Sequence, residues 1–400
     1  MVVWAAFLAA VACIWLSRHI TIWRGQRMVE TLTADDSDGW PADAPFVSVV
    51  LAAKDEEANI ETAVRTFLEQ DYPSFEVIVV NDRSTDGTAE VLERLRSEQP
   101  DSRLKVLCVD ELKEGWFGKN NAMREGVAAA RGQWLCFGDA DCRQTSPRSL
   151  SAAVRYATDH HVEFLSVLPN LENHTVWERI IQPACSAVMV FWFPPMRVND
   201  PFCKEAYANG AFMLLSRDCY EAIGGHAAVR AEVNEDMHLA RLCKEKGRRL
   251  YVIQNDGLYT VRMYSEFGQI WSGWSRIFYG CFGTFRRLAV TLRMLLLMNV
   301  FPYASFLIAL GALFAWGWSG LDFGWRCVLI ASSAAIAAQQ SVIARFYKLS
   351  RVHPAWTPTF IVGVVICVGM LLNAMRRLGG RATTTWRGTT YRADEVVEAS

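Results

Sequence analysis

This 400-residue chain has no excess of one charge sign and no cysteine pair with the spacing of a metal site. Its 41 Lys and Arg residues nearly balance 42 Asp and Glu residues, and at a formal net charge of −1 no nucleic-acid partner is expected. The eleven cysteines lie between Cys13 and Cys367 without a C-x-x-C pair, which argues against a zinc site and against a disulfide scaffold. Several stand inside apolar runs, as free thiols do in a reducing compartment.

Long apolar runs are missing from residues 24–293 but occur on both sides of that stretch. Residues 2–16 are almost wholly apolar, and this first run can extend to Trp23. Three later runs approach or exceed the roughly 20 residues that cross a bilayer, namely 294–318, 327–344 and 357–375. The chain therefore combines membrane segments with a long stretch of ordinary globular composition, in which chemistry is to be sought.

The basic residues around these runs predict an orientation. Arg18, Arg24 and Arg27 follow the first run, which favours an uncleaved anchor with its C-terminal flank in the cytoplasm. The alternative, a cleaved signal peptide, lacks a small-x-small site after Cys13. Three later crossings would leave the arginines after residue 375 outside, against the charge rule, so one segment is expected to be re-entrant or interfacial. The candidates are 357–375 and the segment with Gln339-Gln340.

The expected organisation has five parts: a transmembrane anchor at 1–23, a juxtamembrane linker at 24–45, an α/β domain at 46–285, a membrane domain at 286–378 with about three transmembrane or re-entrant helices, and a polar tail at 379–400. In the α/β domain, strand patterns at 46–53, 75–81, 104–109 and 134–137 alternate with helical spacings. This alternation predicts a mainly parallel sheet whose ligands gather at the carboxyl ends of the strands.

Polar residues follow three of these strands. In "LCFGDADC", Asp139 and Asp141 would meet on one side of the chain, where a divalent cation beside a phosphate would relieve their repulsion; the alternative is a solvated turn. Asp82 in "NDRSTDG" suits a nucleoside N–H or a ribose hydroxyl, or it caps the next helix. Lys119 in "GWFGKNNAM" suits phosphate oxygens at a helix start, or it is a solvated lysine.

The ordered motifs resemble those of family 2 glycosyltransferases with the GT-A fold over about residues 46–280. They are VSVVLAAKDEE from Val47, NDRSTDG, Gly118-Lys119 with Ala122 and Gly126, Asp139-Ala-Asp141, Asn209-Gly210-Ala with Ile223-Gly-Gly, and Asn234-Glu235-Asp236. The membrane layout and the closing Trp386-Arg-Gly-x-x-Tyr resemble the bacterial branch of hopene-associated and carotenoid glycosyltransferases and, more distantly, ceramide glucosyltransferase.

The resemblance implies roles for these residues. Asp55 or Glu56 and Asp82 would hold uridine, with Lys119, Asn209 and Gly210 also in the nucleotide-sugar site, Lys119 at the diphosphate. Asp139 and Asp141 would bind the diphosphate through Mn²⁺ or Mg²⁺, with Asp141 as the more direct ligand. Asp236, preceded by Glu235, would be the general base that takes a proton from the acceptor hydroxyl. The alternative for this acidic pair is to complement the dipole of the helix that it opens.

The chain departs from the family pattern at two places. Processive synthases and ceramide glucosyltransferase carry a Gln/Arg-x-x-Arg-Trp signature after the base, whereas the matching stretch here is QIWSGWSR from Gln269 to Arg276. Trp274 and Arg276 would then supply a stacking plane and a cation directed at phosphate. The first motif reads Lys54-Asp55 where Tyr-Asn is frequent.

The expected acceptor comes from the membrane. The apolar, aromatic stretch within 177–196 is too short to span and is either a core helix or an interfacial one, and the arginines that precede the second long apolar run suit anionic headgroups. The sequence thus predicts a multi-pass cytoplasmic-membrane enzyme whose catalytic domain faces the cytoplasm and transfers a hexose from a UDP-sugar to a lipid hydroxyl, with inversion. The rivals are a processive polysaccharide synthase, disfavoured by the missing Arg-Trp signature and only three later spans, and a silent scaffold, disfavoured by the retained aspartates.

Overall fold

The structure, a computed structural model, describes residues 1–37, 40, 44–99 and 103–379, and the backbone of 384–386, 389–392 and 395–398. Contacts divide the chain into two units. The helical unit comprises residues 1–28, 173–192 and 264–382, and the α/β unit comprises residues 29–172, 193–263 and 383–400. In the predicted tail at 379–400, the described backbone forms three short paired strands, β12 (Thr384–Trp386), β13 (Thr389–Arg392) and β14 (Glu395–Glu398).

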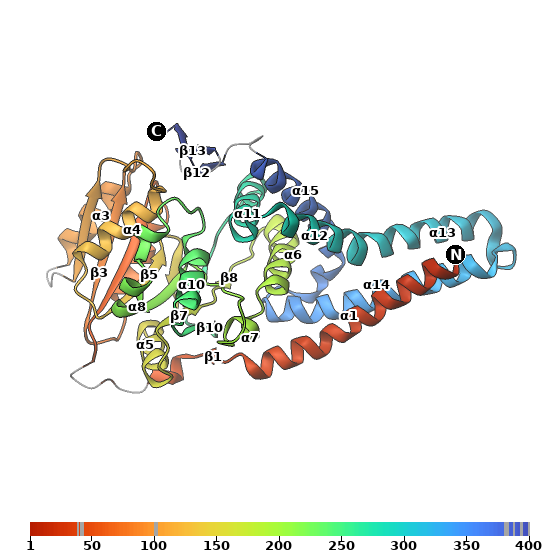
Figure 1. Ribbon diagram of the computed structural model, residues 1–400, viewed down its shortest axis with the longest axis horizontal. Helices are drawn as coiled ribbons and strands as arrows, with labels where there is room; N and C mark the ends of the chain where they lie inside the picture. Colours follow the sequence, from red (N-terminus) through yellow and green to blue (C-terminus); the bar gives the residue numbers. More distant parts are fainter. Residues whose placement is uncertain are drawn as a thin grey trace. The chain divides into compact units, whose positions relative to one another are not determined.

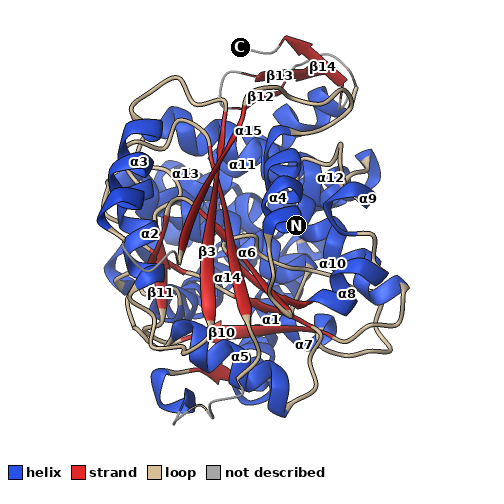
Figure 2. Ribbon diagram, turned by 90° about the vertical axis from the view of Figure 1, so that its left-hand side faces the viewer, coloured by secondary structure: helices blue, strands red, loops and turns tan. Residues whose placement is uncertain are grey.

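The α/β unit is built on an eight-stranded, mainly parallel sheet (Figure 2). Its strands in spatial order are β1 (Thr31–Leu32), β10 (Leu250–Asn255), β7 (Phe164–Val167), β9 (Phe212–Ser216), β5 (Trp134–Asp139), β2 (Val47–Ala53), β3 (Phe75–Asp82) and β4 (Leu104–Val109). Only β9 runs antiparallel to its neighbours β5 and β7. The prediction of an α/β fold with a mainly parallel sheet is confirmed.

Helices connect the strands, as the apolar spacing predicted. They are α2 (Ile60–Leu68), α3 (Thr88–Glu98), α4 (Gly118–Ala129), α5 (Ser149–Asp159), α7 (Pro195–Val198), α8 (Arg217–Ala222), α9 (Gly225–Ala228) and α10 (Glu235–Glu245). Helix α2 begins only at Ile60, because the preceding loop turns at Asp55, whose φ is +52°. The hydroxyl of Ser84, in the loop after β3, accepts the N–H of Asp55, and the hydroxyl of Thr88, the first residue of α3, accepts the N–H of Glu56.

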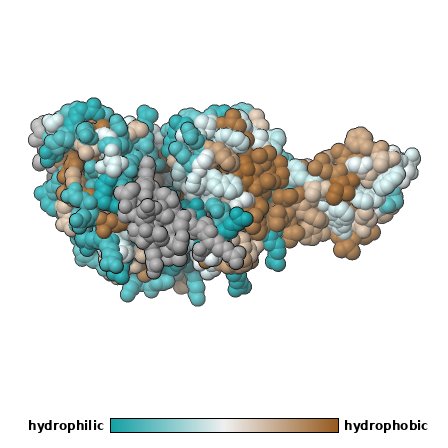
Figure 3. Space-filling model, turned by 90° about the horizontal axis from the view of Figure 1, so that it is seen from above, coloured by the Kyte–Doolittle hydropathy of each residue, from teal (hydrophilic) through white to brown (hydrophobic). Residues whose placement is uncertain are grey.

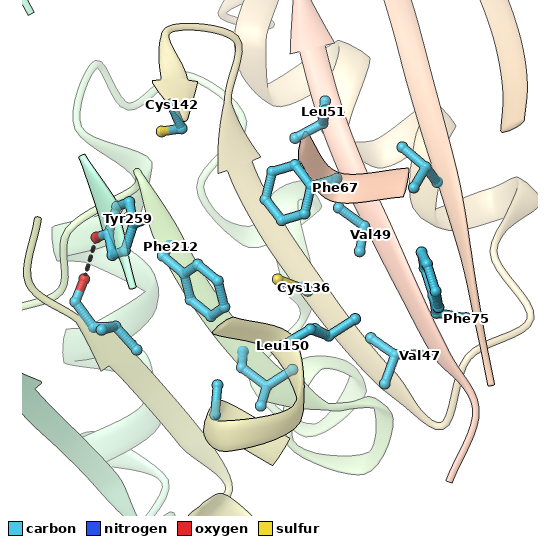
Figure 4. Close-up of a cluster of buried hydrophobic side chains, with 14 of the residues drawn as sticks. Val47, Val49, Leu51, Phe67, Phe75, Cys136, Cys142, Leu150, Phe212 and Tyr259 are labelled. Carbon is cyan, nitrogen blue, oxygen red and sulfur yellow. Dashed lines mark hydrogen bonds between the residues drawn. The ribbon is translucent and has the colours of Figure 1, made fainter. Parts of the chain in front are cut away.

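The core of the α/β unit lies between the sheet and helices such as α2 and α5 (Figure 4). Alternate residues of β2, Val47, Val49 and Leu51, are fully buried on one face, with Phe67 of α2 and Leu150 of α5 in the same cluster. A second sheet joins β6 (Cys142–Gln144), β11 (Tyr259–Val261) and β8 (Asn170–Leu171) in that order. Burial of the alternating apolar residues of β2 and of the side chains that pack on them is the main force that holds the strand ends in place.

The helical unit contains four helices that are long and apolar enough to cross a membrane. Its elements are α1 (Val2–Met28), α6 (Val176–Trp192), α11 (Phe267–Phe282), α12 (Phe285–Leu295), a π-turn η2 (Leu296–Val300), α13 (Phe301–Gly320), α14 (Phe323–Leu349), a 3₁₀ turn η3 (Pro354–Thr359) and α15 (Phe360–Leu378). Helices α1, α13 and α14 lie side by side, and α15 packs on α6 and α11 (Figure 1).

Candidate active site

Loops with acidic residues leave three neighbouring strands at the same edge of the large sheet. Asp139, the last residue of β5, is paired with Ala52 near the end of β2, and the next strand, β3, ends in Asp82. The loop that follows β2 carries Asp55 and Glu56 to this edge. The carboxyl ends of parallel strands thus bring together acidic residues that are far apart in the chain.

Lys119, the second residue of α4, lies between two of these carboxylates. Its Nζ is 2.6 Å from Oδ1 of Asp139 and 2.7 Å from Oε1 of Glu235, the first residue of α10. Burial disfavours the ammonium, but the charges of Asp139 and Glu235 outweigh it and raise the pKa of Lys119 well above its ordinary value. No local sequence pattern links these three residues, so their pairing was not predictable from the sequence. The expected contact of Lys119 with a diphosphate stays a prediction.

Asp236 lies beside this ion-pair network, and both of its carboxylate oxygens accept backbone hydrogen bonds. The N–H of Gly210 donates to Oδ2 at 2.9 Å, and the N–H of Met237 donates to Oδ1 at 2.7 Å. Burial, and then the charge of Glu235, raise the pKa of Asp236 to about 7. A carboxyl group with such a pKa can take up a proton near neutral pH, as a general base must. Asp236 also stands in the first turn of α10, so both of its expected roles are compatible with the geometry.

Gly210 permits the close approach of these groups. A Cβ at this position would lie 3.2 Å from Nζ of Lys119, 3.4 Å from Oε1 of Glu235 and 3.6 Å from Oδ2 of Asp236. A side chain would therefore crowd the ion pair, which explains the glycine of the Asn209-Gly210 motif in physical terms.

Asn209 shapes the turn that presents Gly210. Its N–H donates to Oγ of Ser166 at 2.8 Å, and its own Oδ1 accepts the N–H of Ala211 at 3.0 Å. The amide side chain thus holds the local backbone, and the expected contact of Asn209 with a nucleotide-sugar stays a prediction.

Asp141 is half-buried two residues beyond Asp139. Burial, and then the charges of Asp139 and Glu56, raise its pKa to about 8. Three neighbouring carboxylates repel one another, and a divalent cation would relieve that repulsion; their hard oxygen donors fit Mn²⁺ or Mg²⁺. Among the described residues no group of three His, Cys, Asp or Glu side chains could hold an ion. An ion on Asp139 and Asp141 would therefore complete its coordination with phosphate oxygens and water.

The two loops expected to hold uridine are fastened to each other. Oδ1 of Asp55 accepts the N–H of Thr85 at 2.8 Å, and the N–H of Asp55 donates to Oγ of Ser84 at 3.0 Å. The buried carboxylate of Asp82 accepts two hydrogen bonds, at 2.9 and 3.0 Å, from the guanidinium of Arg83. Arg83 was missed by the sequence analysis, although its position directly after Asp82 was the available signal.

Asn120 is a second residue that sequence reasoning missed. Its fully buried amide donates to the carbonyl oxygens of Val229, Arg230 and Glu232, at 2.7, 3.3 and 2.9 Å. The start of α4, which carries Lys119, is thereby fastened to the segment that leads into α10. The Lys-Asn-Asn run in the sequence was the only hint of this.

A polar cavity of about 140 Å³ also opens beside Asp141, and the sequence analysis did not predict it. Because Arg143 of β6 pairs with Thr260 of β11, these residues share one face of the small sheet, and Asp141 and Arg262 continue that face. The lining residues are Asn59, Thr62, Asp141, Cys142, Arg143, Glu172, Thr260 and Arg262.

Trp274 and Arg276 belong to α11 of the helical unit. Trp274 is buried, its indole N–H donates to Oε1 of Gln182 at 3.2 Å, and its ring packs on Phe278. Nη2 of Arg276 is 3.4 Å from the hydroxyl of Tyr264. Their expected contacts with a nucleotide-sugar stay predictions.

Comparisons with known proteins show a family-model match, a similar sequence and a similar fold. Residues 48–224 match the family model described as Glycosyl transferase family 2. The 4,4'-diaponeurosporenoate glycosyltransferase of Staphylococcus aureus (strain USA300) is 25% identical over 232 residues, 58% of this chain and 60% of that relative, so the match spans less than two thirds of the relative's length. The solved mannosyltransferase PcManGT from Pyrobaculum calidifontis, in complex with GDP-Man and Mn²⁺, is similar in fold, with a TM-score of 0.52 at 19% identity, covering 93% of this chain and 98% of that one.

Proposed function

Since this chain carries a family 2 glycosyltransferase domain with a GT-A fold, we propose that it is a membrane-bound inverting glycosyltransferase that moves a hexose from a UDP-sugar to a lipid hydroxyl. The observation that carries the proposal is the network at the carboxyl edge of the sheet. There Lys119 bridges Asp139 and Glu235, and Asp236 lies beside them with a pKa raised to about 7.

The donor is held at the Asp139 end of this network. Asp139 and Asp141 would bind Mn²⁺ or Mg²⁺, and this ion, when bound, neutralises the charge that develops on the leaving diphosphate. Asp55, Glu56 and Asp82 offer hydrogen-bond acceptors to the nucleoside. The ammonium of Lys119 supports binding of a phosphate, because it stays charged in the free protein and lies next to Asp139.

The acceptor reacts at the Asp236 end. The acceptor hydroxyl transfers its proton to the carboxylate of Asp236, its oxygen bonds to the anomeric carbon, and the bond from that carbon to the diphosphate oxygen breaks. Attack from the face opposite the leaving group inverts the anomeric centre. The backbone N–H groups of Gly210 and Met237 hold the carboxylate in position for this proton transfer.

A lipid acceptor is supported by two observations. The helical unit has four helices apolar enough to enter a membrane. The similar Staphylococcus aureus protein is named for a diaponeurosporenoate acceptor. The catalytic unit is proposed to face the cytoplasm, because basic residues follow the first apolar helix.

The proposal is tested by incubating membranes that contain the full chain with Mn²⁺ and radiolabelled UDP-glucose, UDP-N-acetylglucosamine or GDP-mannose. A labelled product that partitions into organic solvent is expected from a UDP-sugar. Label in an alcohol-precipitable polymer would indicate a processive synthase, and label only from GDP-mannose would correct the nucleotide. No incorporation from any of these donors, with the protein folded, would support the scaffold alternative.

The metal assignment is tested separately by binding. Asp141→Ala should weaken Mn²⁺-dependent binding of UDP by at least roughly tenfold, since even outer-shell changes cost 10–100-fold in metal affinity. Calorimetric titration of the purified protein gives this value, with Asp159→Ala, an exposed change at the end of α5, as the matched control. An unchanged Mn²⁺ titration for Asp141→Ala would remove Asp141 from the ligand set.

A further inference from the structure

We propose that only three of the four long apolar helices, α1, α13 and α14, cross the membrane. Helix α15 lies instead with α6, α11 and α12 as a basic platform on anionic phospholipid headgroups, on the side of the membrane that holds the α/β unit. The platform is defined as these four helices. This inference concerns topology and lipid binding, and it does not depend on the proposed transfer reaction.

Helices α1, α13 and α14 form a bundle with continuous contacts. The indole N–H of Trp4 donates to Oγ of Ser305 at 2.9 Å, and further along the bundle the indole N–H of Trp15 donates to the carbonyl oxygen of Met298 at 3.1 Å. Leu8 packs against α13 and α14 between these levels. Figure 1 shows the three helices running side by side. Each therefore passes through the same layer.

The uncharged length of this bundle matches a bilayer. Between Arg326 and Arg345, helix α14 has eighteen uncharged residues, which rise about 27 Å, against roughly 30 Å of hydrocarbon. Arg345 marks the boundary, because its guanidinium donates to the carbonyl oxygen of His19 and to Oε1 of Gln26 near the end of α1. Exposed apolar side chains such as Phe314 and Ile330 cover the bundle, and hydrophobic colour predominates over much of it in Figure 3.

The polar pair Gln339-Gln340 does not remove α14 from the bundle. Nε2 of Gln339 donates to Oδ1 of Asn299 at 2.8 Å, and Nε2 of Gln340 donates to the hydroxyl of Tyr303 at 2.6 Å. Both amide groups thus donate to neighbouring helical segments, η2 and α13, although Oε1 of Gln339 has no partner among the described residues. Of the two segments that the charge rule singled out, the one that leaves the membrane is therefore 357–375.

Helix α6 cannot cross a membrane, because the chain returns to the same sheets at both of its ends. Strands β7 and β8 precede it and β9 follows it, all in the α/β unit. Its first turn also contains the fully buried carboxylate of Glu178, which accepts the N–H groups of His174 and Thr175. A helix with both ends joined to one water-soluble unit stays on one side of the bilayer.

Helix α15 is packed along α6 and α11. A Cβ on Gly363 would lie 2.2 Å from the carbonyl oxygen of Ile180, and one on Gly369 would lie 2.6 Å from the ring of Trp271. Figure 1 shows α15 running across the direction of α1, α13 and α14. If α15 crossed the bilayer, these contacts would carry α6 into the hydrocarbon, which its connections forbid.

Charge is distributed as an anionic surface requires. From residue 267 to 378 the chain has one acidic residue, Asp322, and it lies at the far end of the bundle, near Arg326. The platform has no acidic residue except Glu178, but it has Arg286 and Arg287 at the start of α12 and further arginines in α6, α11 and α15. With three crossings every basic cluster falls on one side, and only the single Arg326, beside Asp322, lies on the other, so the distribution follows the positive-inside rule.

The platform also offers an apolar face. Val362, Val365 and Leu372 of α15 are 46%, 53% and 45% exposed, although they belong to the most apolar of the four long helices. Apolar side chains beside arginines are typical of helices that lie in the interface, with the apolar side at the acyl chains and guanidinium groups at phosphates.

The topology is tested on the full chain with a protease site inserted after Gly320, after Gly379 or after Glu111, an exposed loop position of the α/β unit. In sealed vesicles, the sites at 111 and 379 should be cut from one face and the site at 320 only from the other. Cutting at 379 and 320 from the same face would overturn the proposal. An epitope after Ser400, read with an antibody, gives the same decision if an insertion prevents folding.

Lipid binding is tested with purified full-length protein and fluorescent phosphatidylglycerol against phosphatidylcholine. The double variant Arg286→Gln/Arg287→Gln should lose the preference for phosphatidylglycerol by at least roughly fivefold, because each basic residue near an anionic surface contributes about that factor. Arg326→Gln, at the other end of the bundle, should leave it unchanged. Equal binding of both lipids by the unaltered protein, or an equal loss with Arg326→Gln, would contradict the platform.

Discussion

At the scale of single residues, the site combines two neighbouring ionisable groups whose charged forms are stabilised to different degrees. Lys119 stays charged in a half-buried position because two carboxylates compensate it, while the neighbouring Asp236 accepts backbone hydrogen bonds and has a pKa raised to about 7. One cluster thus contains a fixed charge and a group that can exchange a proton. Such a division suits a reaction in which one end holds a phosphate and the other end takes a proton.

Asp236→Asn should lower transfer by at least roughly 100-fold, because an amide cannot accept the acceptor proton and general bases contribute 10²–10⁴-fold. UDP binding should stay close to that of the unaltered protein, whereas thermal stability should fall, because Oδ1 of asparagine accepts only one of the two backbone N–H groups and its Nδ2 opposes the other. Single-turnover rates measure the effect, and Glu245→Gln at the exposed end of the same helix is the control. Normal turnover in Asp236→Asn would take away its role as base.

The activity of the unaltered protein should rise with pH through about 7. The pKa of Asp236 is raised to about 7, so the carboxyl is protonated and inactive as a base below that pH and ionised above it. The initial rate with saturating donor and metal, measured from pH 5.5 to 8.5, gives the profile. A flat profile across this range would show that another group accepts the proton.

At the scale of elements, periodicity alone predicted four of the eight strands of the large sheet, and β1, β7, β9 and β10 were not predicted. Alternating or continuous apolar residues in the strands and the 3.6-residue spacing in the helices are local properties, and β2, β3, β4 and β5 lie where those patterns predicted them. The boundaries of the elements were less predictable. Helix α1 continues to Met28, beyond the predicted anchor at 1–23. Helix α2 begins only at Ile60, because the hydroxyl of Ser84 accepts the N–H of Asp55 in the loop that precedes the helix. The sequence did not predict which elements pack against each helix. The residues of α6, for example, are equally compatible with a core helix and with an interfacial helix.

The contact of α15 with α6 can be tested by a single methyl group. Gly363→Ala places a Cβ against the carbonyl oxygen of Ile180, which cannot move without shifting α6. Overpacking of this kind costs about 1–3 kcal/mol, so the midpoint of thermal unfolding in detergent should fall by several degrees. Gly311→Ala in α13, where no atom lies within 4 Å of the added Cβ, should leave the midpoint unchanged or slightly higher. Equal midpoints for both variants would contradict the close packing.

At the scale of the whole molecule, charge is divided between the units. The residues of the helical unit include fifteen Lys and Arg against three Asp and Glu, a net charge of +12, so the −1 of the whole chain leaves −13 on the α/β unit. The near-zero total hides this division. A unit with a net negative charge is repelled by an anionic membrane, and a unit with a net positive charge is attracted to it.

The full chain should stay in the membrane pellet after extraction with 1 M salt and after extraction with alkaline carbonate. Salt screens the attraction of the arginines, but the apolar helices remain buried in lipid. Immunoblotting of pellet and supernatant measures this. Release by carbonate would show that the chain is held only at the surface, which would contradict three crossings.

The sequence by itself determined the alternation of strands and helices, the apolar segments and the order of the acidic motifs, because each of these depends on neighbours in the chain. Only the tertiary structure decided that Lys119 pairs with Asp139 and Glu235, and that the amide of Asn120 fastens α4 to the segment before α10. It also decided which long apolar helix packs on α6 rather than in the bundle. Contacts between distant residues are set by how faces and charges are buried together, and hydropathy along one segment contains no information about its partner.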